Sequence, residues 1–212
     1  MSITGWDDSI RDFLNKAGSD APTPGGGSVA ALVGALGASM TSMVANLSQG
    51  AKFADVQPLM RDIVKQMESL SSRCEELLAA DIASFQAYME ALKLPKSTDA
   101  EKAARAAAME QAAVGAIEVP LALLKLCLDG LRCAQTITDC SNKNVISDLG
   151  ISAILFEASA QSALLTIDIN LAGLKDAETK RRYADETAAL MTEISVIKET
   201  ALNSIRSKIH SS

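Results

Sequence analysis

The sequence predicts an all-α fold, a single-domain bundle of about six helices over residues 1–212 with two buried central helices. Hydrophobic residues make up 48% of the chain but aromatic residues only 3%, so the core must be aliphatic and helix-forming alanine can dominate it. The 12 glycines and 5 prolines cluster, whereas an all-β chain needs a turn signal every ~8–12 residues. The high hydrophobic content also argues against disorder.

Helical periodicity predicts the first three helices at about residues 6–17, 28–47 and 56–92. Gly18 ends the first helix, and Pro58 is tolerated in the first turn of the third. The second helix carries one stripe of large residues and one of small residues, so we expect both faces to be packed.

The remaining helices are predicted at about residues 98–140, 148–171 and 177–209. Thr98 and Glu101 form a capping-box pattern, and Pro120 is expected to kink or divide the fourth helix. The fifth helix is almost as uncharged as the second, whereas the sixth is amphipathic and should lie outside. Since a monomer of this size has little room to bury two long apolar helices, we expect a homodimer.

The net charge of −6 disfavours a nucleic-acid partner. No residue between Asp20 and Lys52 is charged, but this stretch is too rich in Gly, Ser and Thr to predict a membrane helix. The four cysteines form no C-x-x-C pair, which favours buried free thiols in a reducing compartment. The first 13 residues lack the pattern of a signal peptide, so we expect a cytoplasmic protein.

The loop at 21–28 is the first candidate site, because three glycines lead into the second helix. Glycines permit φ > 0, and a helix N-terminus favours an anionic ligand group. A Walker loop has a Lys-Ser/Thr pair after its glycines, and a Rossmann turn has a strand before them. This loop has neither feature. The alternative is a tight turn between packed helices.

Asp81 is the second candidate, because it interrupts the apolar stripe of the third helix. A carboxylate there is paired, desolvated with a raised pKa, or directed into a cavity; alternatively it binds a helix terminus or a buried cation.

A third group of polar residues lies on the fifth helix and its lead-in. Ser147 or Asp148 is expected to cap that helix. Glu157, Asp168 and Asn170 lie in an otherwise apolar helix and need partners, which a polar ligand, Lys52 or Lys125 could supply. The group comprises Asn142, Asn144, Ser147, Asp148, Glu157, Asp168 and Asn170.

His210 is the only histidine, so neither a Ser-His-Asp triad nor a histidine metal site is expected. Chemistry would have to use carboxylates, lysine, serine, amides or backbone dipoles.

The segment PTPGGGSVAA at 22–31 resembles the opening motif of the cyclodeaminase domain of the formiminotransferase-cyclodeaminase family. The same domain occurs alone as a bacterial methenyltetrahydrofolate cyclohydrolase. Further matching segments follow in order over about residues 10–205: QGAKF at 49–53, Asp81 with Phe85, LPK at 94–96, EVP at 118–120, Asn144 with Ser147 and Asp148, and INL at 169–171. The sequence departs from the family at Phe53, often Tyr there, at Thr166 and Ile167, commonly Asn-Val, and at Ser141, frequently Gly.

The resemblance implies a dimeric, all-helical enzyme that acts on a tetrahydrofolate derivative and holds no metal or permanently bound cofactor. It implies Asp81, Asp148 and Lys52 as catalytic residues. The substrate-binding residues that it implies are Pro24, Gly25, Gly26, Gly27, Ser28, Phe85, Asn144, Ser147 and Asn170.

Hydrolysis of 5,10-methenyltetrahydrofolate to 10-formyltetrahydrofolate, a reversible reaction, fits these residue types. The substrate is a delocalised cation to which water adds, so a site needs a carboxylate, a base and a proton donor. The first alternative is a cyclodeaminase that closes formiminotetrahydrofolate and releases ammonia. The second is a non-catalytic helical subunit that binds folate or a partner enzyme.

Overall fold

The computed structural model describes residues 5–211. Residues 1–4, part of the segment in which no signal peptide is expected, lie outside it, as does Ser212. The described chain is helical and contains no strand, which confirms the all-α prediction. Its elements are α1 (Ile10–Ala17), α2 (Gly26–Asn46), the 3₁₀ turn η1 (Ala51–Val56), α3 (Gln57–Lys93), α4 (Asp99–Ile137), the 3₁₀ turn η2 (Lys143–Val145), α5 (Ile146–Leu171) and α6 (Ala177–His210).

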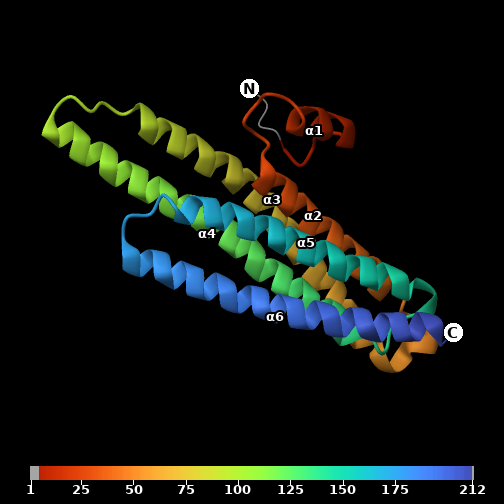
Figure 1. Cartoon of the computed structure of the whole chain (residues 1–212). Helices are drawn as coiled ribbons and strands as arrows, with labels where there is room; N and C mark the ends of the chain where they lie inside the picture. Colours follow the sequence, from red (N-terminus) through yellow and green to blue (C-terminus); the bar gives the residue numbers. More distant parts are fainter. Residues whose placement is uncertain (1–4, 212) are drawn as a thin grey trace.

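The long helices form an elongated bundle in which α2 packs between α3 and α5 (Figure 1). The helix α4 contacts α3, α5 and α6, and α6 covers one side of α4 and α5. At one end, α3 and α4 extend as a hairpin past the start of α2, and α1 lies beside that start (Figure 1).

The helix ends follow the capping signals. Thr98 Oγ1 accepts from the Glu101 N–H at 3.2 Å, and Glu101 Oε2 accepts from the Thr98 N–H at 3.0 Å, so the capping box is confirmed. Ser9 caps α1, which therefore begins later than the periodicity predicts. The helix α4 continues through Pro120 and is not divided.

Glycines let the central helices approach closely. Cβ atoms placed on Gly37 and Gly130 would lie 3.1 and 2.3 Å from the ring of Phe156, so this buried ring fills space that both glycines leave. Two buried hydroxyls of α5 then reach the backbone of α2: Ser159 Oγ donates to the Ala30 carbonyl at 2.7 Å, and Ser152 Oγ donates to the Gly37 carbonyl at 2.9 Å. These bonds satisfy polar groups inside an apolar core.

The prediction of two buried central helices holds for one side of each helix. The small-residue stripe of α2 is buried, but Leu36 and Leu47 of its large-residue stripe are 48% and 49% exposed. The helix α5 likewise has a buried side and an exposed apolar side. The exposed large hydrophobic residues of α2 and α5 are Val29, Leu36, Leu47, Ile151, Ile154, Leu165 and Ile169, which we call the α2/α5 apolar face.

Three described helical segments are long and apolar enough to cross a membrane when judged by length and composition alone. They are α2, α4 and the segment 143–171, and about half of each most apolar window is buried inside the bundle.

The burial of the cysteines predicts an order of reactivity. Burial raises the pKa of the Cys74 and Cys127 thiols to about 12 and that of Cys133 to about 11. At pH 8 only about one in ten thousand thiols with a pKa of 12 is ionised, so these two are protected from disulfide reagents. Half-buried Cys140 should react first. When the folded protein is labelled with a chromogenic disulfide reagent, one thiol should react fast, and this fast reaction should be absent in Cys140→Ser. Several thiols that react equally fast would contradict the burial of the other cysteines.

Candidate functional site

A cavity of about 340 Å³ opens where α2 begins. It is lined by the loop before α2, by α2 itself, and by α3, α4 and α5. The lining residues are Pro22, Thr23, Gly25, Gly26, Gly27, Asp81, Ser84, Phe85, Tyr88, Ala116, Thr166 and Asn170. The cavity therefore unites the glycine motif with Asp81, Phe85 and Asn170, which the sequence predicted as site residues from three separate segments.

Asp81 lies against the first turn of α2 because residue 27 has no side chain. A Cβ on Gly27 would lie 2.1 Å from Asp81 Oδ1, closer than atoms can approach. The buried Ser28 Oγ donates to Asp81 Oδ2 at 2.8 Å. Ser28 thus positions the carboxylate from behind the cavity wall, and Oδ1 lies over Gly27.

The N-terminus of α2 has no side-chain cap. Gly25 is the N-cap residue with φ −102°, and Gly26 and Gly27 are the first two residues of the helix. The glycines therefore do not form the left-handed turn that the sequence allowed; they keep side chains away from the first backbone N–H groups. Such N–H groups carry the positive end of the helix dipole and suit a carbonyl or anionic ligand group. Pro24 is buried beneath this turn and does not line the cavity.

Asn170 is oriented by a gap in the hydrogen bonding of α4. Pro120 has no N–H, so the Ala116 carbonyl four residues earlier lacks its helical donor. Asn170 Nδ2 donates to this carbonyl at 3.1 Å and to the Thr166 carbonyl of its own helix at 2.8 Å. Both amide hydrogens are used, which directs the side-chain oxygen of Asn170 to be the acceptor in the cavity wall.

Sequence reasoning did not select Ser84, Tyr88 or Thr166 as site residues. Ser84 and Tyr88 follow Asp81 by three and seven positions on α3, a spacing that places all three on one side of the helix and could have identified them. Thr166 was noted only as a departure from the family. Its Oγ1 donates to the Ser162 carbonyl at 3.2 Å, so its hydroxyl is used within α5.

The other predicted residues lie at the opposite end of α2. Lys52 is exposed in η1, which follows Gly50 with φ +93°, a conformation that favours glycine. Asn144 and Ser147 are exposed and Asp148 is half-buried, in η2 and the first turn of α5. None of Lys52, Asn144, Ser147 and Asp148 lines the first cavity.

Asn142 attaches this second cluster to the C-terminal end of α2. Asn142 Nδ2 donates to the Leu47 carbonyl at 3.0 Å, and its backbone N–H donates to Ser48 Oγ at 2.8 Å. Its Oδ1 accepts from the Asn144 N–H at 3.1 Å and so caps η2. The helix α5 begins at Ile146 with Val145 as N-cap, so neither Ser147 nor Asp148 caps it as expected.

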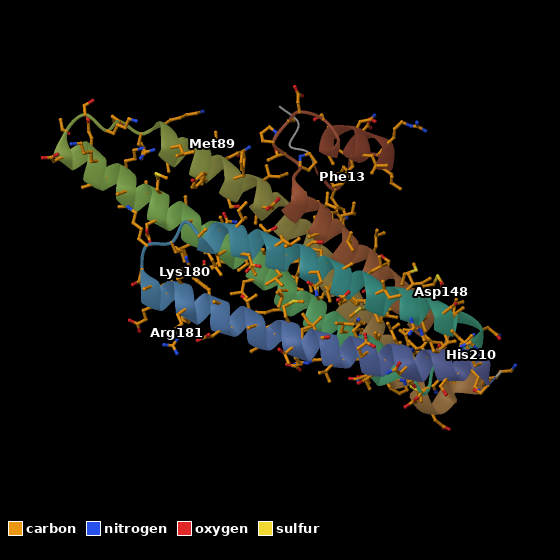
Figure 2. The ribbon with its side chains drawn as sticks, viewed as in Figure 1. Phe13, Met89, Asp148, Lys180, Arg181 and His210 are labelled. Carbon is orange, nitrogen blue, oxygen red and sulfur yellow. The ribbon has the colours of Figure 1, made fainter. Side chains whose placement is uncertain are left out.

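The length of α5 keeps the first cavity apart from the second cluster within one chain. Asp148 and Asn170 lie near opposite ends of α5, and a rise of 1.5 Å per residue separates them by about 33 Å. Figure 2 shows Asp148 near the end of the bundle that carries His210, whereas Phe13 of α1 lies beside the start of α2, away from that end. One chain therefore does not bring Lys52 and Asp148 to Asp81.

Three other polar residues of the sequence argument have partners or face solvent. Asp168 is exposed, and half-buried Glu157 accepts from Gln161 at 3.3 Å. Lys125 pairs with Glu186 at 2.6 Å. These three residues therefore do not require a ligand, or one another, as hydrogen-bond or ion-pair partners. Among residues 5–211, no group of three or more His, Cys, Asp or Glu side chains is placed to hold a metal ion.

The fold and cavity define an all-helical class of protein with a cavity at a helix N-terminus, where a carboxylate and an oriented amide line the wall. The chain belongs to the formiminotransferase-cyclodeaminase family, whose model matches residues 9–189.

Two curated relatives show how the chain compares in length. It is 36% identical to a methenyltetrahydrofolate cyclohydrolase of Methylorubrum extorquens over 96% of this chain and 98% of that protein. It is 32% identical to the formimidoyltransferase-cyclodeaminase of Mus musculus over 95% of this chain but 38% of that protein.

A solved structure supports the same assignment. The crystal structure of formiminotetrahydrofolate cyclodeaminase from Thermotoga maritima superposes with a TM-score of 0.81 at 27% identity, covering 97% of each chain.

The contact between Gly27 and Asp81 predicts the effect of a single methyl group. Gly27→Ala should displace Asp81, destabilise the fold by about 1–3 kcal/mol and lower activity at least tenfold, because the carboxylate loses its position. Gly115→Ala is the matched control, since a Cβ there meets no atom within 4 Å. The melting temperature and the turnover rate should fall only in Gly27→Ala. Equal melting temperatures and rates in the two variants would contradict the close contact between Gly27 and Asp81.

Proposed function

We propose that this protein hydrolyses 5,10-methenyltetrahydrofolate to 10-formyltetrahydrofolate. The observation that carries the proposal is the cavity at the start of α2, whose lining includes Asp81, the first turn of α2 and Asn170. The similarity to a methenyltetrahydrofolate cyclohydrolase over nearly its full length supports the same reaction. The proposal extends the activity of that relative to this chain.

The substrate's methenyl carbon joins two ring nitrogens and shares one positive charge with them. In the proposed step the oxygen of water bonds to this carbon, and Asp81 accepts a proton from the water. The bond between the carbon and one nitrogen then breaks, and its electron pair stays on that nitrogen, which takes up one proton. At the same time the added hydroxyl loses its remaining proton and becomes the formyl C=O. The products are the formyl compound and one released proton, so atoms and charge balance.

Asp81, the start of α2 and Asn170 each have a part in this step. The carboxylate of Asp81 offsets the substrate's positive charge and orients water, while Ser28 holds its second oxygen at 2.8 Å. The N–H groups at the start of α2 suit a carbonyl or anionic part of the folate. The side-chain oxygen of Asn170 accepts a hydrogen bond from an N–H of the bound ring system.

Cyclodeamination of formiminotetrahydrofolate is the second candidate reaction. It is favoured by the overlap with a structure described as formiminotetrahydrofolate cyclodeaminase and by the match to cyclodeaminase relatives. The same carboxylate would serve it, since both reactions pass through a tetrahedral carbon between two nitrogens. A non-catalytic helical subunit that binds folate or a partner enzyme is the third candidate, and its folate-binding form predicts binding without turnover.

The first experiment follows the ultraviolet absorbance of methenyltetrahydrofolate with purified protein, in a buffer that keeps spontaneous hydrolysis slow. We expect a fast, protein-dependent loss of the methenyl band. Asp81→Asn should lower this rate about 10²- to 10⁴-fold with an unchanged melting temperature, because an amide cannot accept the proton. Turnover of formiminotetrahydrofolate alone would select the second reaction, and unaltered turnover in Asp81→Asn would remove Asp81 from the mechanism.

We also propose that the protein is a homodimer joined through the α2/α5 apolar face. Several large hydrophobic side chains of this face are about half exposed or more, including Leu36, Ile154, Leu165 and Ile169. A self-complementary interface with two-fold symmetry would cover them. This interface, together with a cytoplasmic location, is our alternative to membrane insertion for the apolar helices.

A two-fold axis across the middle of this face would join the two separated polar groups. It would set the start of α2 in one chain beside the end of α2 in the other. Lys52 and Asp148 of the partner subunit would then approach the cavity that holds Asp81. The predicted catalytic residues, which lie too far apart within one chain, would meet between two chains.

Mixing two inactive variants tests this arrangement. If each site takes Asp81 from one chain and Asp148 from the other, a heterodimer of Asp81→Asn and Asp148→Asn contains one intact site. Random exchange of equal amounts should therefore restore about a quarter of the wild-type turnover. Asp168→Asn, an exposed carboxylate outside both clusters, is the control for charge loss. No recovery after verified subunit exchange, or a monomer at assay concentration, would contradict the shared site.

A further inference from the structure

We propose that Tyr88 donates the proton that the departing ring nitrogen takes up. This inference rests on the proposed function, because it supplies a residue for a step that hydrolysis of the methenyl compound requires. When the carbon–nitrogen bond breaks, the electron pair stays on the nitrogen, and an acid that protonates this nitrogen lowers the barrier. Asp81 takes a proton from water in the same reaction, so the site needs a second group that gives one.

Most polar side chains of the first cavity, the one at the start of α2, already use their hydrogens within the fold. Ser84 Oγ donates to the backbone carbonyl of Asp81 at 2.9 Å. Thr166 Oγ1 donates to the Ser162 carbonyl at 3.2 Å, and Asn170 donates both of its amide hydrogens to carbonyls. The backbone N–H groups at the start of α2 form hydrogen bonds but are far too weakly acidic to release a proton. None of these groups can serve as the acid.

Two hydroxyls of the cavity wall remain, those of Thr23 and Tyr88. No hydrogen bond joins either hydroxyl to another described residue. A phenol releases its proton far more readily than an aliphatic alcohol does, and tyrosine is among the side chains that act as general acids. The choice between the two hydroxyls therefore falls on Tyr88.

The two tyrosines of the chain have different environments. Tyr183 is 4% exposed, and its hydroxyl donates to Glu118 Oε1 at 3.0 Å, so this hydroxyl holds α6 against α4. Tyr88 is 36% exposed and lines the cavity. The fold therefore leaves the Tyr88 hydroxyl available to a ligand.

The position of Tyr88 on α3 suits a reaction that needs a base and an acid. Tyr88 follows Asp81 by seven residues, close to two helical turns, so both lie on one side of α3 with their Cα atoms about 10 Å apart. Long side chains of a helix lean toward its N-terminus, which directs Tyr88 back toward Asp81. The attacking water and the methenyl carbon fit between the two side chains, with the departing nitrogen beside the phenol.

Asp81 is the rival donor, because it could return the proton that it takes from water. Its carboxylate is fixed on the α2 side of the cavity, since Ser28 donates to Oδ2 at 2.8 Å and Oδ1 lies over Gly27. A carboxyl group held in this way does not follow the proton across the ring to the nitrogen. Two separate groups on one side of α3 avoid this movement.

Atoms and charge balance with Tyr88 as the donor. The Oη–H bond of Tyr88 breaks as the carbon–nitrogen bond breaks, and the proton forms the new N–H bond. Water loses two protons, the first to Asp81 and the second when the added hydroxyl becomes the formyl C=O. One of these two protons restores the Tyr88 hydroxyl, and the other is the one proton that the reaction releases.

The test is Tyr88→Phe, which removes the hydroxyl and keeps the ring. We expect kcat for methenyltetrahydrofolate to fall about 10²-fold or more, with KM and the melting temperature nearly unchanged. Added imidazole buffer, whose protonated form is a small acid, should restore rate to Tyr88→Phe in proportion to its concentration at constant pH and ionic strength. The rate without protein is subtracted. The wild type should not respond, and a loss of structure would not be rescued in this way.

Tyr183→Phe is the matched control, because it removes the other tyrosine hydroxyl, which lies outside the cavity. Its kcat should equal that of the wild type even if its melting temperature falls. Thr23→Val removes the second available hydroxyl of the cavity. Wild-type kcat in Tyr88→Phe, or a loss of rate that imidazole rescues in Thr23→Val and not in Tyr88→Phe, would overturn the proposal.

The two proposals fail in different ways. Hydrolysis by the wild type with undiminished kcat in Tyr88→Phe would retain the proposed function and refute the donor. Turnover of formiminotetrahydrofolate alone would refute the hydrolysis, and the same variant would then judge Tyr88 in that reaction, in which a nitrogen also departs. Absence of turnover of both compounds would refute both proposals.

Discussion

The architecture depends on how closely α2 can approach its neighbours. Gly37 and Gly130 make room for the ring of Phe156 in the centre of the bundle, and Gly27 makes room for Asp81 at one end. A Cβ on Gly130 would overlap the ring of Phe156, one on Gly37 would be tight against the same ring, and one on Gly27 would displace Asp81. The hydroxyls of Ser152 and Ser159 then bond to α2 carbonyls that close packing brings within reach. The core and the cavity are consequences of one packing arrangement.

That arrangement explains why one apolar stripe of α2 is buried and the other is exposed. A stripe of alanine and glycine gives a smooth surface that packs against α3 and α5, so it is buried in the chain itself. The stripe that includes Leu36 and Leu47 points away from this contact and remains exposed. Hydrophobic periodicity identifies both stripes but contains no information about which one the tertiary contacts use. In this protein, the stripe that allows close approach of helix backbones is buried, and the stripe with the larger side chains is not.

Much of the fold and part of the site follow from local signals in the sequence. The capping box at Thr98, the stop at Gly18 and the anomalous Asp81 on an apolar stripe each have a short-range cause, and the structure places Asp81 in a cavity wall. The separation of Asp148 from Asn170 has a different origin. Sequence motifs give an order along the chain, whereas rigid helices convert that order into distance. The length of α5 was sufficient to show that both residues could not serve one cavity in one chain. The role of Asn170 as a bridge to α4 needed the tertiary contact with Ala116.

Pro120 therefore has a second consequence besides its effect on α4. The carbonyls of a helix normally accept hydrogen bonds from N–H groups of the same helix, and a proline leaves one carbonyl without this donor. Here the released carbonyl belongs to Ala116, and an amide from another helix uses it. The orientation of Asn170 is thus encoded in a residue that does not line the cavity. A chain with an N–H at position 120 would return the Ala116 carbonyl to the hydrogen bonding of α4, and the amide of Asn170 would lose one of the two acceptors that fix its orientation.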